Sequence, residues 1–324
     1  MIDLCLLGTG GTMPLPERAL TSLYVKYNGH GLLIDCGEGT QIMIRRKKLS
    51  LHDIDVILFT HYHADHISGL PGLLLSVAKS ERCEPITLAG PGELRNVVES
   101  LCVIARELPF EIRYIELDGE YRRLDLIGLK IDAFPVRHSV MCYGYALSLE
   151  RAGKFDPVRA KQLGIPKKMW KQLQNNLTAE YNGRIFYPCD VLGKPRKGIK
   201  VTYCTDTRPT DTMLRYAKNS DLFICEGMYA EPEKITKAEK NFHCMFSEAA
   251  QLAKDADVSC LWLTHFSPSL SNPESYLDEV KRVFENTVIP EDMQSLTLGF
   301  EDSWSGALSA VILDYNELPS ARKG

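Results

Sequence analysis

The 324-residue chain is predicted to have a layered α/β fold, and three features of the sequence lead to this prediction. Apolar, β-branched segments alternate with segments of helical periodicity along most of the chain. A hydrophobic content of 44% and a charged content of 25% are typical of a globular protein with a sizeable core. Several apolar strands end directly in a histidine or an aspartate, which is where α/β folds usually build their sites.

The first half of the chain opens with strands and turns and then alternates strands with helices. Residues 2–8 and 21–37 read as strands, with Asn28-Gly29 as a hairpin turn. Further strands are expected at 55–60, 84–91, 110–117, 120–138 and 142–150, and helices at 38–48, 69–80 and 92–106.

Residues 151–200 break this rhythm, because they are basic, rich in Gly and Pro, and contain one amphipathic stretch at 167–177. The alternation then resumes. Strands are expected at 198–206, 221–227, 259–265 and 306–315, and helices at 210–220, 246–257 and 273–287.

Metal-binding and proton-binding side chains crowd the end of one predicted strand. The stretch LFTHYHADHISGL, residues 58–70, places His61, His63, Asp65 and His66 within six residues. On an extended segment His61 and His63 point to the same side, and Asp65 and His66 in the following turn can face a second ion. This spacing predicts a two-metal site, in which water is activated and the attacking and leaving oxygens are clamped. The alternative is that these four residues form an ordinary polar surface loop. The buried strand that precedes them argues against this alternative.

Three later strands end in further candidate ligands. His138 ends KIDAFPVRH, Asp206 ends KVTYCTD and His265 ends CLWLTH. Taken singly, His138 or His265 is better read as a core histidine with a backbone hydrogen bond. Taken with the first cluster, all three are predicted to bind metal, because nitrogen and carboxylate donors are the ligands of hydrolytic zinc sites.

The charge of the chain is distributed unevenly. The net charge is −4, but residues 151–200 hold 12 Lys and Arg against 3 Asp and Glu, a local balance of +9. The remaining residues hold 26 against 39, a balance of −13. A basic insert in an acidic chain predicts that this one segment meets a polyanion.

The ten cysteines include no C-x-x-C pair, which predicts reduced, buried thiols and a cytoplasmic location. No apolar run reaches the roughly 18 residues that a membrane span needs, so no membrane partner is expected. The N-terminal residues 1–11 have no basic region before their apolar run and are expected to form the first strand rather than a signal peptide.

The pattern H-Y-H-A-D-H with the later His, Asp and His resembles the metal motif of the metallo-β-lactamase superfamily. More narrowly, the chain resembles the ribonuclease Z family, endonucleases that mature the 3′ end of transfer RNA, over nearly its whole length. The stretches that carry this likeness are LLGTGGTMPLPERALTSL, IDCGEGTQ, FTHYHADHISGLPGLL, VRHSVMCYGY, DVLGKPRKGIKVTYCTDTRP and LTHFSP.

The resemblance implies a metallo-β-lactamase αββα sandwich, in which helices flank two β-sheets. It implies one such domain over residues 1–324, with 151–200 as an inserted, protruding basic exosite arm and its return segment. Two divalent ions would be bound, zinc for preference and manganese as an alternative. The implied ligands are His61, His63 and His138 for one ion, Asp65, His66 and His265 for the other, and Asp206 as the bridge.

The implied reaction is endonucleolytic removal of the 3′ trailer from precursor transfer RNA, leaving a 3′-hydroxyl. A water whose pKa is lowered toward about 7 would attack as hydroxide, and Asp65 would accept its proton. For the leaving group the family uses a Glu–His pair on loops that commonly read His-Glu-Ala-Thr and His-Ser-Thr. The corresponding stretches here, ICEGMY and NFHCMFS, keep Glu226 and His243. The neighbours Cys225, Gly227, Met228, Cys244 and Met245 depart from the common pattern, which leaves the loop conformation open.

The insert resembles the arm with which this family grips transfer RNA. Its phosphate-binding candidates are Lys154, Arg159, Lys161, Lys167, Lys168 and Lys171, with Gly164 and Pro166 in the tip turn. Trp170 is expected to pack the arm on itself rather than to lie against a base. The alternative is an ordinary solvated basic loop. The family also implies a homodimer, in which the arm of one subunit holds RNA that the other cleaves.

Two other functions are compatible with parts of the pattern. A metal-dependent hydrolase of small phosphodiester, sulfate or thioester substrates would share the ligands but has no use for the basic arm. An RNA-binding scaffold without catalysis would have no use for the ligand set. Near the N-terminus, LGTGGT is expected to be a tight turn under the metal site rather than a dinucleotide loop, and Asp35 is expected to support a ligand histidine.

Overall fold

The computed structural model describes residues 1–300, which divide into two compact units. The first unit comprises residues 1–147 and the described residues from 200 onward, and the second comprises 148–199. The strand expected at 306–315 lies outside the described residues. Within residues 1–300, none of the helices combines the length and the apolar character needed to cross a membrane.

The first unit contains two seven-stranded sheets, and the first of them begins and ends with distant parts of the chain. Its order is β16-β1-β2-β3-β4-β5-β6. The strands are β1 (Ile2–Gly8), β2 (Ser22–Tyr27), β3 (His30–Ile34), β4 (Ile54–Leu58), β5 (Ile86–Pro91), β6 (Ile112–Leu117) and β16 (Gln294–Leu298). The pairs from β16 to β3 are antiparallel, and those from β3 to β6 are parallel.

The second sheet has the order β15-β14-β13-β12-β9-β8-β7. Its strands are β7 (Arg122–Leu126), β8 (Leu129–Val136), β9 (Cys142–Arg151), β12 (Arg196–Cys204), β13 (Leu222–Glu226), β14 (Leu261–Thr264) and β15 (Thr287–Val288). The four strands from β12 to β15 run parallel. Their carboxyl ends therefore lie at one edge, as do those of β3, β4 and β5 in the first sheet.

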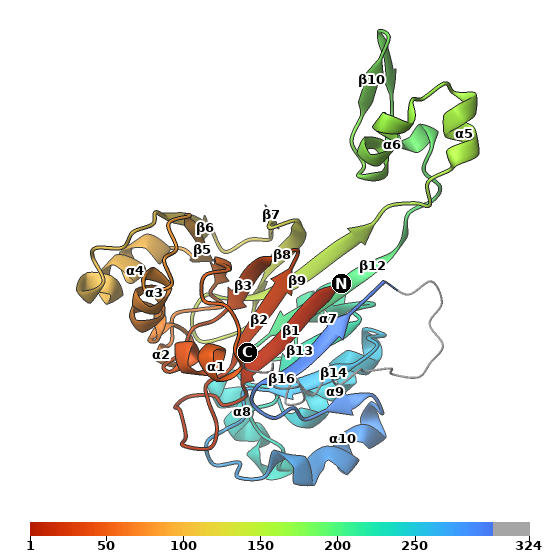
Figure 1. Ribbon diagram of the computed structural model, residues 1–324. Helices are drawn as coiled ribbons and strands as arrows, with labels where there is room; N and C mark the ends of the chain where they lie inside the picture. The colour runs from red at the N-terminus through yellow and green to blue at the C-terminus, as the bar shows by residue number, and fades with distance from the viewer. Residues whose placement is uncertain (301–324) are drawn as a thin grey trace, which may run out of the picture. The chain divides into compact units, whose positions relative to one another are not determined.

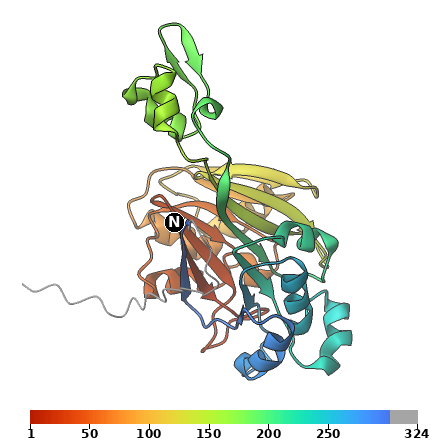
Figure 2. The same ribbon diagram turned by 90° about the vertical axis from the view of Figure 1, so that its right-hand side faces the viewer.

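Helices cover the two sheets from outside, as Figures 1 and 2 show. On the first sheet lie α1 (Thr40–Arg46), α2 (Ala64–Ile67), α3 (Leu70–Ala78) and α4 (Leu94–Leu101), which continues into the 3₁₀ turn Cys102–Ile104. On the second lie α7 (Asp211–Ala217), α8 (Ile235–Asn241), α9 (Phe246–Asp255) and α10 (Leu277–Val283), with 3₁₀ turns at Pro232–Lys234 and Pro273–Tyr276. The prediction of two sheets flanked by helices is confirmed.

The strands next to the candidate site are buried on both faces. In β4, Ile57 packs into a cluster with the side chains of α1 and α3, whereas Val56 and Leu58 are buried on the opposite face. Directly after β4, the two sheets are joined by a hydrogen bond of 2.6 Å from the Tyr145 hydroxyl of β9 to the carbonyl of Phe59. Burial on both faces explains why DIDVILFT reads as a continuous apolar run.

The second unit has a small core of its own. It contains α5 (Pro157–Gln162), α6 (Lys167–Gln174), the hairpin β10 (Ala179–Tyr181) with β11 (Arg184–Phe186), and a 3₁₀ turn at Pro188–Asp190. The buried residues of its core are Ala160, Ile165, Leu173, Ala179, Phe186 and Val191. The Trp170 indole donates to the Ile165 carbonyl at 3.0 Å and lies 5.2 Å from the ring of Phe155, so it packs inside the unit as expected.

None of the ten cysteines is paired in a disulfide, and eight of them are buried. Cys83 and Cys189 are exposed. The fold of the described residues is therefore held by packing and hydrogen bonds rather than by disulfides.

Candidate metal centre

The candidate ligands follow the carboxyl ends of strands in both sheets. The first cluster follows β4 and enters α2, while His138, Asp206 and His265 follow β8, β12 and β14. Asp206 and His265 have positive φ values of 50° and 59°, a conformation that is strained for these residues and typical of functional sites. Close approach of ligand atoms defines three groups: His61, His63, His138 and Asp206; Asp65, His66 and His265; and Asp206, His243 and His265.

The first group converges on one point between imidazole nitrogens. His63 Nδ1 lies 2.9 Å from His61 Nε2 and 3.3 Å from His138 Nε2. Two nitrogens bound at about 2.0–2.1 Å to one tetrahedral ion lie roughly 3.3 Å apart, so these spacings suit a shared ion. Asp206 Oδ1 lies 3.9 Å from Nε2 of both His61 and His138.

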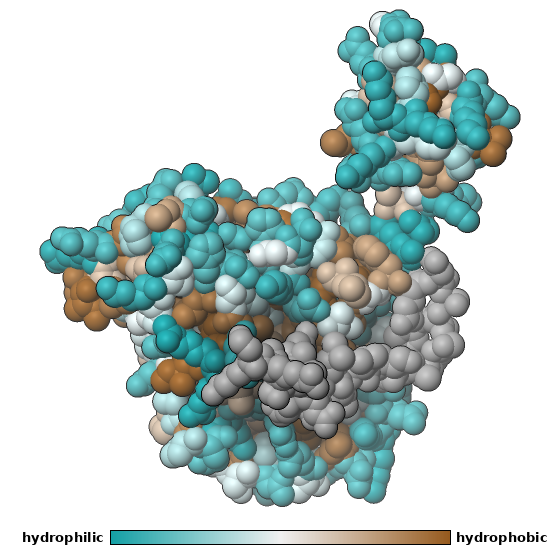
Figure 3. All heavy atoms as spheres, in the orientation of Figure 1, coloured by the Kyte–Doolittle hydropathy of each residue, from teal (hydrophilic) through white to brown (hydrophobic). Residues whose placement is uncertain are grey.

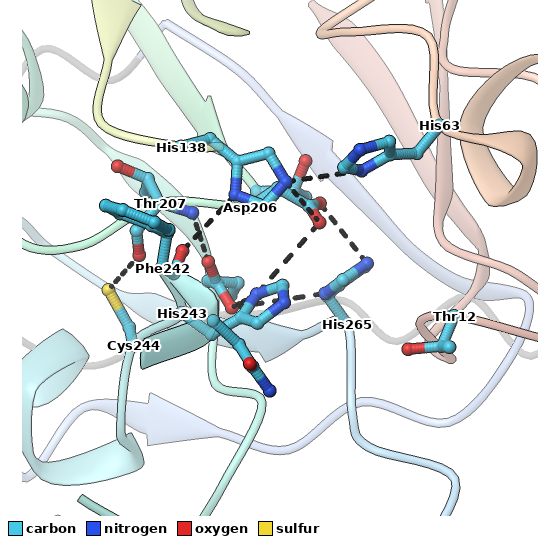
Figure 4. A network of polar contacts seen from close by, with 12 residues as sticks. Thr12, His63, His138, Asp206, Thr207, Phe242, His243, Cys244 and His265 are labelled. Carbon is cyan, nitrogen blue, oxygen red and sulfur yellow. Dashed lines mark hydrogen bonds and ion pairs between the residues drawn. The ribbon is translucent and has the colours of Figure 1, made fainter. Parts of the chain in front are cut away.

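The second group converges in the same way on the other oxygen of Asp206. The Nε2 atoms of His66 and His265 lie 3.3 Å apart, and Asp65 Oδ2 lies 3.4 Å from each of them. Asp206 Oδ2 lies 3.0 Å from His66 Nε2 and 3.2 Å from His265 Nε2. Asp206 therefore turns one oxygen toward each group, and Figure 4 shows His265 and His138 directed toward it.

Hydrogen bonds at the far sides of the rings direct lone pairs inward. The Nδ1 atoms of His61, His66 and His138 face Thr60 Oγ1 at 3.1 Å, Asp35 Oδ2 at 2.8 Å and the Phe242 carbonyl at 3.4 Å. When Nδ1 carries the proton, Nε2 is left as a metal donor. Burial lowers the pKa of His138 to about 4 and that of His61 well below 6.5, so both rings are neutral at pH 7.

Two observations show that the donor set fits divalent cations. Among residues 1–300, the buried atom Asp206 Oδ2 has no hydrogen bond of suitable geometry, although Nε2 of His66 and Nε2 of His265 lie 3.0 and 3.2 Å from it. Burial would lower the pKa of His66, but the carboxylates of Asp206 and Asp35 outweigh it and raise that pKa well above 6.5. An unsatisfied buried carboxylate oxygen and the negative charge of Asp206 and Asp35 around His66 both call for positive charge at the centre.

Asp35 supports the second group from behind. It follows β3 with a φ of 62°, is fully buried, and accepts hydrogen bonds from the Thr60 N–H at 2.8 Å and from the Thr60 hydroxyl. Its other contact is His66 Nδ1 at 2.8 Å. The expectation that Asp35 supports a ligand histidine agrees with this geometry.

Glu226 and His243 lie beside the ligand groups as a hydrogen-bonded pair. Glu226 ends β13 and is fully buried, and its Oε2 lies 3.0 Å from His243 Nδ1. His243 Nδ1 also lies 4.0 Å from Asp206 Oδ1. Burial would lower the pKa of His243, but Glu226 and Asp206 outweigh it and raise that pKa to about 9.

The unusual neighbours of this pair face the interior. Cys225 is buried within β13, and the Cys244 thiol donates to the Thr207 carbonyl at 2.9 Å, as Figure 4 shows. The Met228 N–H donates to the Cys244 carbonyl at 3.0 Å, and the Met245 N–H donates to Glu248 at 2.9 Å. The departures from the common pattern thus occupy core positions, and Glu226 and His243 are still brought together.

Other residues around the centre were not singled out by sequence reasoning. Thr60 orients Asp35 and His61, and a Cβ atom at Gly11 would lie 2.7 Å from ring atoms of His265. Thr207 and Arg208 contact the Glu226–His243 pair. Gly11 lies in LGTGGT, and Thr207 and Arg208 lie in CTDTRP, but only the folded chain shows which group each residue contacts.

The predicted RNA-binding residues all lie in the second unit and present their charges to solvent. The exposed cationic side chains are Lys154, Arg159, Lys161, Lys167, Lys168 and Lys171. Gly164 has a φ of 72° in the turn between α5 and α6, and Pro166 is the N-cap residue of α6. Figure 3 shows a mostly hydrophilic surface on this unit.

Known proteins resemble this chain over nearly its full length. Ribonuclease Z of Lachnospira eligens is 54% identical over 302 residues, which cover 93% of this chain and 99% of that protein. A sequence-family model described as anti-Pycsar protein Apyc1 matches residues 2–106.

Solved structures resemble the fold. Human tRNase Z, short form, is 23% identical with a TM-score of 0.65, covering 92% of this chain and 100% of that one. The metallo-β-lactamase fold protein YhfI from Bacillus subtilis is 18% identical with a TM-score of 0.65, covering 91% and 98%. The predicted metallo-β-lactamase fold is thereby confirmed.

Proposed function

The chain belongs to the ribonuclease Z family, and on that premise we propose that it is a metal-dependent endoribonuclease that removes the 3′ trailer from precursor transfer RNA. The observation that carries the proposal is the convergence of two ligand groups on the two oxygens of Asp206, beside the Glu226–His243 pair.

We assign His61, His63 and His138 to one divalent ion, Asp65, His66 and His265 to a second, and Asp206 to both. The nitrogen-rich donor set favours zinc, and manganese is the alternative. When bound, such ions supply Lewis acidity, which activates water near neutral pH and stabilises charge on the phosphodiester.

One of these ligands, Asp65, and the Glu226–His243 pair beside them supply the proton transfers. Hydrolysis forms a bond from the water oxygen to phosphorus and breaks the bond to the 3′ oxygen of the transfer RNA. The water loses one proton, and we assign Asp65 as its acceptor because Asp65 is the partly exposed carboxylate of the ligand set. The departing 3′ oxygen gains one proton, for which His243 is suited because Glu226 favours its protonated form. The products are a 3′-hydroxyl on the transfer RNA and a phosphate on the trailer.

The second unit supplies a contact with RNA through residues other than those of the metal centre. Its exposed lysines and Arg159 are suited to phosphates, which position a nucleic acid without reading its sequence. We regard the chain as a single catalytic domain with residues 151–200 inserted as an arm. By family membership the arm acts across a homodimer, and the ten reduced cysteines favour the cytoplasm.

The test is cleavage of a 3′-extended precursor transfer RNA with zinc or manganese after removal of bound metal. The Gly193 N–H donates to the Lys154 carbonyl at 2.9 Å, so residues 155–192, with their own core, can be replaced by a short Gly-Ser turn. We expect a single cut by the intact protein, loss of that cut without the arm, and retained hydrolysis of a small aryl phosphodiester by both. An intact protein that hydrolyses the small diester and leaves the precursor uncut would instead be a small-ester hydrolase.

A further inference from the structure

The two residues after Asp206 contact both members of the Glu226–His243 pair. The Thr207 N–H donates to Glu226 Oε1, and Arg208 Nη1 donates to the carbonyl oxygen of His243 at 2.7 Å. One short segment after β12 therefore carries the shared ligand Asp206 and contacts Glu226 and His243 as well.

The guanidinium of Arg208 is itself fixed on the far side. Its Nη1 donates to Glu248 Oε2 at 2.8 Å, and its Nη2 pairs with Glu248 Oε1. Glu248 also accepts the Met245 N–H at 2.9 Å, which caps α9 directly after the loop of His243. Fork-shaped pairing of this kind fixes orientation as well as distance, and lysine cannot reproduce it.

The backbone of the same segment is attached to the end of β8. The Arg208 N–H donates to the Arg137 carbonyl at 2.9 Å, and the Arg137 N–H donates to Thr207 Oγ1 at 3.1 Å. Because His138 follows directly, the segment is anchored to a strand end that also carries a candidate ligand.

We propose that Arg208 is a positioning residue for proton donation by His243, an inference that rests on the proposed function. The His243 peptide is held on both sides, since its N–H donates to the Ala238 carbonyl at 2.9 Å and its carbonyl accepts from Arg208. Without the guanidinium, that carbonyl loses its charged donor and the loop between α8 and α9 can shift. Displacement of a catalytic group by about 1 Å can cost up to about 100-fold in rate.

Arg208→Ala is therefore expected to lower kcat for precursor transfer RNA by about 10- to 100-fold, with little change in KM. A leaving group that needs no proton separates this role from a general structural one. Hydrolysis of an aryl phosphodiester releases a stable phenolate and should change by less than about twofold. The matched control is Arg95→Ala, which removes an exposed arginine from a pair with Glu99 at 3.5 Å.

Three further measurements complete the test. His243→Ala should show the same selective loss, and Arg208→Ala added to it should cause no further loss, because Arg208 acts through His243. Arg208→Lys should fall between wild type and Arg208→Ala. Bound metal per chain, measured by elemental analysis, should be unchanged in Arg208→Ala.

Two results would overturn the inference. One is wild-type cleavage of the precursor by Arg208→Ala. The other is equal loss on both substrates together with loss of bound metal, which would assign Arg208 to the integrity of the metal centre. If the wild-type protein leaves the precursor uncut, the proposed function fails. The role of Arg208 is then tested by comparing hydrolysis of a dinucleotide by wild type and Arg208→Ala, because its leaving group is also a ribose hydroxyl.

Discussion

The carboxylate of Asp35 lies 2.8 Å from Nδ1 of His66, and both side chains are fully buried. This contact fixes the His66 tautomer that leaves Nε2 free to bind metal. Asp35→Asn keeps the shape and tolerates the positive φ, but it removes the charge and one of the acceptors that Thr60 and His66 share. We expect metal affinity to fall about 10- to 100-fold while the protein remains folded. Zinc titration of the metal-free proteins by calorimetry checks this, and equal affinities would contradict it.

Gly11 is expected to be essential because of the ring it touches. A Cβ atom there would lie 2.7 Å from atoms of the His265 imidazole, so Gly11→Ala must displace a candidate ligand. We predict fewer bound ions per chain and at least about a tenfold loss of activity. Gly92→Ala is the matched control, since its Cβ would meet only the Leu117 carbonyl at 3.7 Å. Elemental analysis of both variants decides, and full metal content in Gly11→Ala would refute the prediction.

The hydrogen bonds to Asp132, which lies outside the candidate metal centre, predict that the stability of the protein depends on pH. Asp132 accepts hydrogen bonds from the Tyr121 hydroxyl at 2.6 Å and from Arg123 Nε at 2.7 Å. Burial would raise the pKa of Asp132, but these donors outweigh it and hold that pKa below 3.8. The folded-state value is thus lower than the unfolded one, so the stabilisation is present above pH 3.8 and is lost as the pH falls through the folded value.

Arg123→Ala should therefore cost about 1 kcal/mol at neutral pH, a small amount because Arg123 is half-exposed and solvent screens its charge. The cost should shrink in acid. The free energy of unfolding of wild type and Arg123→Ala is measured by urea denaturation at neutral pH and near pH 3. The control is Arg113→Ala, which removes an arginine from an exposed pair with Glu111. A cost that stays constant down to pH 3 would show that the charge of Asp132 is not involved.

The parts of the fold that the sequence predicted are those with strong local signals. The run before His61 and the alternation around α3 and β5 were recognisable because one segment carries its own pattern of burial. By contrast, β16 was not expected. It pairs with β1 from the other end of the chain, aligning Leu296 with Leu4, and nothing local marks such a pairing. In the second unit, the short helix α5 and the hairpin β10–β11 were likewise too brief to give a clear periodicity.

Some residues of the candidate site could likewise be predicted from the sequence, and others could not. Strand-end histidines and aspartates stand out by residue type, so His138, Asp206 and His265 could be grouped with the first cluster before any geometry was known. Thr60 acts through its hydroxyl, Gly11 through the absence of a side chain, and Arg208 through a contact with a backbone carbonyl. None of these features produces a recognisable sequence pattern. Their roles follow only from tertiary distances.

The exposed lysines of α6 provide the sharpest test of the arm. Lys167, Lys168 and Lys171 lie on one helix of the second unit, so replacing all three with alanine leaves the buried core of that unit unchanged. Removal of one lysine that binds a phosphate should reduce the slope of log Kd against log salt by about 0.7–0.9. We expect weaker binding of precursor transfer RNA, a slope smaller by roughly two, and unchanged hydrolysis of an aryl phosphodiester.

The matched control for these lysines is Lys254→Ala combined with Lys281→Ala, two exposed positions on α9 and α10. Binding is measured by filter retention across a salt series, and kcat at saturating precursor is compared in parallel. Phosphate binding away from the reaction raises affinity without changing the chemical step, so kcat should stay at the wild-type value while KM rises. A triple variant with wild-type affinity and salt slope would show that the helix is an ordinary solvated surface, and a fall in kcat alone would place its effect on the reaction rather than on RNA binding.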